Sequence, residues 1–123
     1  MITLLEVGLG GLIGAPTRYV VDQYVTWRTE GAFPWGTFFI NAGGALLLGL
    51  IAGLVAYHHL GSVPVAVVGT GFCGAYTTFS TFTFETIRLV EEGEIRPAIA
   101  NVAGSLVVGL VGAAAGIAVA ALI

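Results

Sequence analysis

Three stretches of this chain are long, apolar and free of charged residues: Trp35–Tyr57, Val63–Phe84 and Pro97–Ile123. A helix that crosses a lipid bilayer needs about 20 mostly apolar residues in a row. Only 9% of the residues are charged, whereas soluble domains average about 25%. These segments therefore predict a membrane protein built from transmembrane helices.

Residues 2–25 form a fourth apolar stretch, although it contains Glu6, Arg18 and Asp22. Charged side chains near the end of a span can reach the interface or a water-filled cavity. No basic residue precedes the apolar run, as one would in a signal peptide. We predict an all-α membrane protein with one integral domain, residues 1–123, and four transmembrane helices at about residues 2–25, 35–57, 63–85 and 97–123.

The small number of charged residues excludes several classes of protein. The basic residues are four arginines, too few for a nucleic-acid-binding surface. Four spans with short connections leave no room for a soluble catalytic domain, so we do not expect an enzyme. The single cysteine, Cys73, excludes a disulfide within the chain.

Glycine pairs four residues apart occur in three of the predicted spans: Gly10 with Gly14, Gly49 with Gly53, and Gly112 with Gly116. Such pairs let helix backbones approach closely in lipid. Four thin helices make a poor pore alone, so we expect an oligomer. The two halves of the chain show no internal repeat of the kind common in transporters, so any two-fold symmetry across the membrane requires a second chain.

The third apolar segment contains the densest polar cluster of the chain. Three glycines fall within residues 69–74, and five hydroxyl side chains follow within residues 77–83. Glycine weakens a helix, and non-helical backbone at membrane depth is tolerated where protein or a water-filled cavity surrounds it. We expect the third helix to break near its middle, where freed carbonyl groups are ready ligands for a cation.

Phenyl rings and hydrogen-bond donors follow this predicted break. Phe79 and Phe82 lie three residues apart and share a helix face. Phenyl edges and neutral donors can replace part of the hydration shell of an anion, whereas a full positive charge at mid-depth would hold the anion too tightly. The pattern suits the passage of a small, strongly hydrated anion, and the positions that favour it are Asn41, Thr78, Phe79, Phe82, Glu85, Asn101 and Ser105.

Four segments of the sequence together resemble the Fluc (CrcB) family of fluoride channels. They are Gly10–Tyr19 (GGLIGAPTRY), Gly36–Gly43 (GTFFINAG), Gly71–Gly74 (GFCG), and Thr77–Phe82 (TTFSTF) with Glu85 after it. The resemblance covers all four predicted spans, and the last two segments are highly specific.

The resemblance implies a multi-pass fluoride channel in the plasma membrane of a bacterium or other microbe, which lets fluoride leave the cytoplasm passively. It implies an antiparallel dimer with two pores, formed by two copies or by a paired homologue, and a structural sodium ion between the subunits. Backbone carbonyls of Gly74 and Thr77 would hold the sodium ion. Asn41, Thr78, Phe79, Phe82, Glu85 and Ser105 would line the pore, Arg18 would line a vestibule, and Asn101 replaces a tyrosine that is usual in the family.

Two other interpretations fit a short four-span chain. A proton-coupled exporter like the small multidrug resistance proteins would need an acidic residue deep in the first helix, and Glu6 near the terminus is the only candidate. A subunit that packs beside a larger complex would explain the glycines but not the hydroxyl cluster. Arg28, Arg88 and Arg96 lie in or beside the first and third loops, so the positive-inside tendency favours both termini outside the cell.

Overall fold

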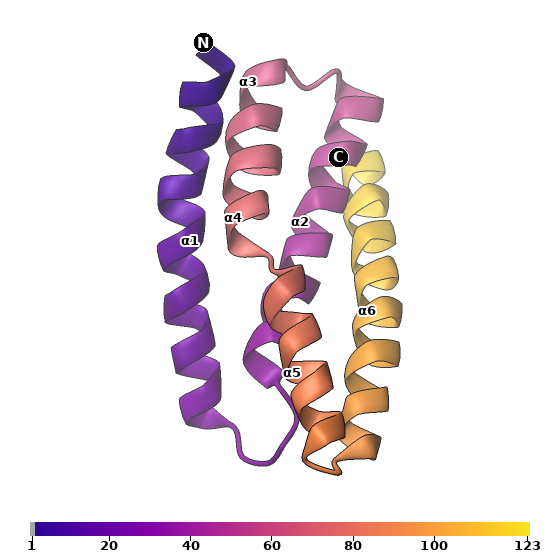
Figure 1. The fold of residues 1–123 in the computed structure, drawn as a ribbon. Coiled ribbons are helices and arrows are strands. Elements are labelled where there is room, and N and C mark those ends of the chain that lie inside the picture. Colours follow the sequence, from indigo (N-terminus) through magenta and orange to yellow (C-terminus); the bar gives the residue numbers. More distant parts are fainter. Residues whose placement is uncertain (1) are drawn as a thin grey trace.

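The computed structural model describes residues 2–123, and all of their regular structure is helical (Figure 1). The prediction of an all-α fold is confirmed for these residues. The long segments run side by side between the two ends of the molecule, with short connections at either end. The elements in chain order are α1 (Ile2–Arg28), α2 (Trp35–His58), α3 (Ser62–Pro64), a π-helix η1 (Val65–Cys73), α4 (Gly74–Tyr76), α5 (Phe79–Glu91) and α6 (Ile95–Leu122).

Helices α2 and α6 pack closely along most of their lengths and run in the same direction (Figure 1). Glycine makes this approach possible. A Cβ atom added at Gly49 would overlap the backbone carbonyl of Ala113, and one added at Gly116 would overlap the Leu46 carbonyl. The glycine pairs in these two spans therefore serve packing within one chain.

Helix α1 packs against η1 in the same manner. A Cβ atom at Gly10 would overlap the Val67 carbonyl, and one at Gly71 would overlap the Val7 carbonyl. Glycines on both helices let the backbone of α1 and the backbone of η1 come into direct contact. As a result, the first half of the third segment packs against α1 and remains helical.

The third segment is interrupted at a different place from the one that the glycines predicted. Residues 65–73, which include most of the glycine run, are π-helical, and the chain stays helical to Tyr76. The extended residues are Thr77 (ψ 161°) and Thr78 (φ −150°, ψ 125°), directly before α5. The glycines lie where α1 approaches, and the interruption lies where side chains replace the helical hydrogen bonds.

Two helices, α2 and α6, are long and apolar enough to cross a membrane on length and composition among the described residues. At about 1.5 Å of rise per residue, their 24 and 28 residues exceed the hydrocarbon thickness of a bilayer. Many large apolar side chains point outward, including Leu106 and Leu110 of α6. Such a surface suits lipid better than water.

Candidate functional site

The side chain of Asn41 on α2 replaces helical hydrogen bonds at the interruption. Asn41 Nδ2 donates to the Thr78 carbonyl oxygen, and the Thr78 backbone N–H donates to Asn41 Oδ1, both at 2.9 Å. An extended residue buried in a helix bundle would otherwise leave its backbone groups unpaired. Asn41 therefore stabilises the non-helical backbone and fixes α5 relative to α2.

Thr78 is buried and caps the N-terminus of α5. Its Oγ1 accepts from the backbone N–H of Thr81 (3.2 Å) and donates to Thr81 Oγ1 (3.0 Å). Ser80 Oγ lies 3.3 Å from the same oxygen. The hydroxyl side chains after the glycines thus begin a new helix, as threonine and serine commonly do at this position.

Because these side-chain hydrogen bonds replace helical ones, two backbone carbonyls lose their usual N–H donors. In an uninterrupted helix the Gly74 carbonyl would accept from Thr78 N–H, and the Thr77 carbonyl would accept from the N–H four residues on. Thr78 N–H donates instead to Asn41, and Thr81 N–H to the Thr78 hydroxyl. The Thr77 oxygen accepts from Arg18 Nη1 at 3.4 Å, which leaves it a second lone pair.

Arg18 lines a cavity of about 240 Å³ beside the interruption. Thr78 and Thr81 form its wall on the α5 side, and Thr37 and Ile40 come from α2. The cavity therefore joins a half-buried guanidinium, which would attract an anion, to the hydroxyl groups at the start of α5.

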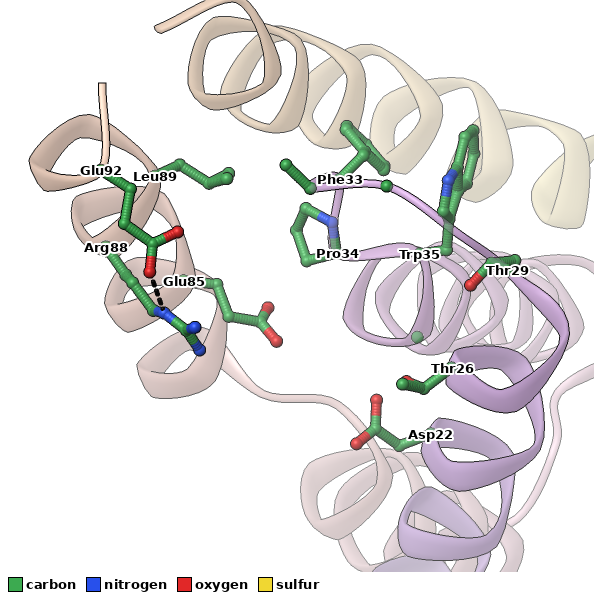
Figure 2. A pocket seen from close by; sticks show the side chains of 13 residues that line it. Asp22, Thr26, Thr29, Phe33, Pro34, Trp35, Glu85, Arg88, Leu89 and Glu92 are labelled. Atoms are coloured by element: carbon green, nitrogen blue, oxygen red, sulfur yellow. Dashed lines mark hydrogen bonds and ion pairs between the residues drawn. The ribbon is translucent and has the colours of Figure 1, made fainter. Parts of the chain in front are cut away.

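A second cavity, of about 280 Å³, lies toward the end of the molecule where α1 connects to α2 (Figure 2). Glu85 extends into it from α5, and Asp22 faces it from α1. Asp22 also lines the cavity of Arg18, so the two spaces adjoin. Glu85 Oε2 is buried and has no hydrogen-bond partner among residues 2–123.

The rim of this second cavity carries an ion pair. Arg88 Nε donates to Glu92 Oε1 at 2.7 Å, one turn further along α5 (Figure 2). The two side chains are 63% and 49% exposed, so the pair contributes little to stability.

The two phenyl rings after the interruption lie together. The ring centroids of Phe79 and Phe82 are 6.0 Å apart, with an angle of 39° between the ring planes. Phe79 is 79% exposed in the single chain. This exposure leaves one face of the aromatic pair open to a ligand, to lipid or to another subunit.

Asn101 and Ser105 lie on adjacent turns of α6. Asn101 is fully buried, and its Nδ2 donates to Thr86 Oγ1 at 2.9 Å. Ser105 Oγ lies 3.5 Å from Asn101 Oδ1, at the limit of a hydrogen bond. The amide thus connects α6 to α5.

The structure gathers the predicted residues into two groups. Asn41, Thr77, Thr78 and Arg18 meet at the interruption. Asn101 meets the turn of α5 that follows Phe82, and Ser105 lies beside Asn101 on α6. No hydrogen bond joins the two groups within residues 2–123.

Two further residues line or support the site: Thr37, which is buried and lies four residues before Asn41 on the same face of α2, and Thr86. The spacing of Thr37 from Asn41 is a signal that sequence could have given, whereas nothing local identifies Thr86.

Comparison with known proteins gives consistent similarities. The family described as CrcB-like protein, Camphor Resistance (CrcB), matches residues 5–117. The chain is 46% identical over 119 residues to fluoride-specific ion channel FluC 1 of Frankia casuarinae, and this match covers 90% of each protein. It is 48% identical over 112 residues to FluC 1 of Streptomyces avermitilis (88% of this chain and 87% of the relative), and 44% identical over 106 residues to FluC 2 of Moorella thermoacetica (86% of each).

Proposed function

The chain belongs to the CrcB family, and we propose that it conducts fluoride along the polar residues that surround the interruption at Thr77–Thr78. It is a fluoride channel of the bacterial membrane rather than an enzyme. As a channel, it lets fluoride leave the cytoplasm passively, and so lowers fluoride toxicity.

The observation that carries the proposed path is the placement of donors at the start of α5. Arg18, Thr78 and Thr81 line one cavity, where the Thr81 hydroxyl accepts from Thr78 and keeps its own hydrogen to donate, and Asn41 holds the backbone there. An amide nitrogen has two hydrogens, of which Thr78 takes one. The second remains for an anion that leaves the cavity.

Beyond this point the path follows the phenyl edges and the polar groups of α5 and α6. Phe79 and Phe82 offer the weakly positive edges of their rings, and Ser105 offers a hydroxyl beside Asn101. Glu85 lies at the start of the path, in the cavity that shares Asp22 with the cavity of Arg18. Fluoride would exchange water for weak donors at each step, which permits rapid release.

We also propose that α3, η1, α4 and α5 form one transmembrane span broken at Thr77–Thr78. With α1, α2 and α6 this gives four spans in a single membrane domain. The support is that this segment, like the other three, runs between the two ends of the molecule (Figure 1). Asn41 and Thr78 pair the interrupted backbone within the protein, as membrane depth requires.

Two inverted copies are proposed to form a dimer with two pores and a structural sodium ion. The exposed ring of Phe79 and the exposed glycine at position 74 offer a surface for a second chain. The carbonyls of Gly74 and Thr77 are among the groups that lose their helical donors at the interruption, and oxygen donors suit a hard cation. Two chains would supply four such oxygens around a bound ion. A paired homologue is the alternative partner, in line with relatives named FluC 1 and FluC 2.

Fluoride efflux from liposomes tests the function. The purified chain is reconstituted in vesicles loaded with potassium fluoride, and external fluoride is followed with an electrode after valinomycin is added. We expect fluoride release without a proton gradient, and none from protein-free vesicles. Transport that requires a proton gradient would instead favour the exporter.

A further inference from the structure

A hydrogen-bonded chain connects Asn101 on α6 to the backbone of Phe82 on α5. Asn101 Nδ2 donates to Thr86 Oγ1 at 2.9 Å, and Thr86 Oγ1 donates to the Phe82 carbonyl at 2.7 Å. Asn101 has 0% of its surface exposed, and Thr86 is half-buried. Because Asn101 has no contact with water, the loss of Thr86 as its partner would leave the amide unsatisfied.

We propose that Asn101 is a positioning residue, which affects conduction by holding Phe82 through Thr86 rather than by touching fluoride. This inference rests on the proposed function. The amide of Asn101 is already engaged at both ends, by Thr86 through Nδ2 and more weakly by Ser105 through Oδ1. Unlike Asn41, which is partly exposed, Asn101 is fully buried, so the second hydrogen of its amide does not reach a passing ion.

The position of Phe82 explains why this link matters for conduction. Thr78, four residues before Phe82, is bonded to Asn41 of α2. Thr86, four residues after Phe82, is bonded to Asn101 of α6. Residues four apart lie on one face of a helix, so α5 is fixed on both sides of the ring, and removal of either link would let the ring move relative to the path.

Thr86 also takes part in both bonds of the chain, which couples them. A hydroxyl that accepts a hydrogen bond becomes a stronger donor, so the Asn101 amide strengthens the bond from Thr86 to the Phe82 carbonyl. The effects of substitutions at the two positions should therefore not add.

Thr83 provides a matched control on the same helix. Its Oγ1 donates to the Phe79 carbonyl at 2.9 Å, with the spacing that Thr86 has to Phe82. Thr83 is exposed, and none of its hydrogen bonds reaches another helix among the described residues. A change at Thr83 therefore removes a hydrogen bond within α5 and leaves the link between α5 and α6 intact.

The experiment measures fluoride efflux from liposomes per folded protein for wild type, Asn101→Leu, Thr86→Val and the double variant. Thr86→Ser keeps the hydroxyl, and Thr83→Val is the control. We expect each single variant to lose about tenfold in flux and the double variant to lose no more than either single one, as for groups that act as a unit. Thr86→Ser and Thr83→Val should stay within about twofold of wild type, as substitutions that keep the link do.

The possible outcomes separate the inference from the function beneath it. If wild type carries no fluoride, the proposed function fails first. If wild type conducts and Thr86→Val conducts equally well, or if the losses multiply in the double variant, Asn101 does not act through Thr86 and the inference is overturned. An equal loss in Thr86→Ser would also overturn it. Thermal unfolding shows whether each variant is folded. If Asn101→Leu does not fold, the comparison of flux through Thr86→Val and Thr86→Ser decides the question alone.

Discussion

At the scale of single residues, Phe82 distinguishes a ring that packs from a ring that conducts. Leucine keeps most of the apolar volume, and a packing position tolerates such a change at a cost below about 1.5 kcal/mol. It has no positive ring edge to offer an anion. We therefore expect Phe82→Leu to lower fluoride flux in liposomes about tenfold or more, a barrier increase of about 1.4 kcal/mol, and Phe79→Leu to act similarly.

The control for this prediction is Phe84→Leu. Phe84 lies on the same helix, is 67% exposed and takes no part in the proposed path. Its replacement should leave flux near wild type. If Phe82→Leu also conducts like wild type while it remains folded, the rings are packing residues and the path lies elsewhere.

Asn41 is the second residue whose exact chemistry matters. Aspartate in its place could still accept from Thr78 N–H but could not donate to the Thr78 carbonyl, which now lies 2.9 Å from Nδ2. It would also place a carboxylate beside that carbonyl and on the path of an anion. The unpaired carbonyl alone costs about 1–3 kcal/mol, so we expect Asn41→Asp to lower fluoride efflux about tenfold to a hundredfold. If this variant releases fluoride at the wild-type rate, Asn41 does not take part in the site.

At the scale of elements, the interruption makes a prediction about sodium. Gly74 has helical backbone angles, and a Cβ atom added there would meet no atom within 4 Å. Valine at this position therefore fits a single chain. If the Gly74 carbonyl meets a sodium ion and a second chain, Gly74→Val should weaken dimerisation, and prolonged removal of sodium should weaken it in wild type.

Gly8→Val is the matched control for this element, because a Cβ atom at Gly8 also meets nothing within 4 Å. Dimer content is measured by cross-linking or by light scattering in detergent, with potassium in place of sodium. A Gly74→Val protein that dimerises like Gly8→Val, together with a wild type that ignores sodium, would speak against the site.

The elements also show which parts of the structure a sequence can predict. Apolar length is a local property, so α2 and α6 lie close to the predicted spans. The place of the interruption depends on the pairing of Asn41 with Thr78, which are 37 residues apart. The glycines pointed to residues 69–74, but contact with α1 keeps that segment helical. Thr86 was missed for a similar reason, because its partner Asn101 lies 15 residues away on another helix.

At the scale of the whole molecule, three arginines lie at one end of the bundle. Arg28 ends α1, Arg88 lies near the end of α5, and Arg96 lies at the start of α6 (Figure 1). Arg28 lies over the rings of Tyr24 and Trp27, at 4.9 and 5.2 Å from their centroids, as an interfacial anchor would. The start of α1, the end of α6 and the connection at residues 59–61 lie toward the other end (Figure 1) and carry no arginine or lysine.

This asymmetry predicts the orientation in the cell. Arginine near the ends of spans favours the cytoplasmic side, and nearby acidic residues such as Glu92 offset this tendency little. A cysteine added after Ile123, in a Cys73→Ser background, should therefore react with an impermeant maleimide mainly from outside intact cells. Glu30→Cys, in the first loop, should react mainly after the cells are opened. Equal labelling of both positions from outside would instead mean that the chain inserts in both directions, since a bias of three arginines is small. A homodimer of inverted copies then needs no second gene product, whereas one fixed orientation requires a partner chain of opposite bias.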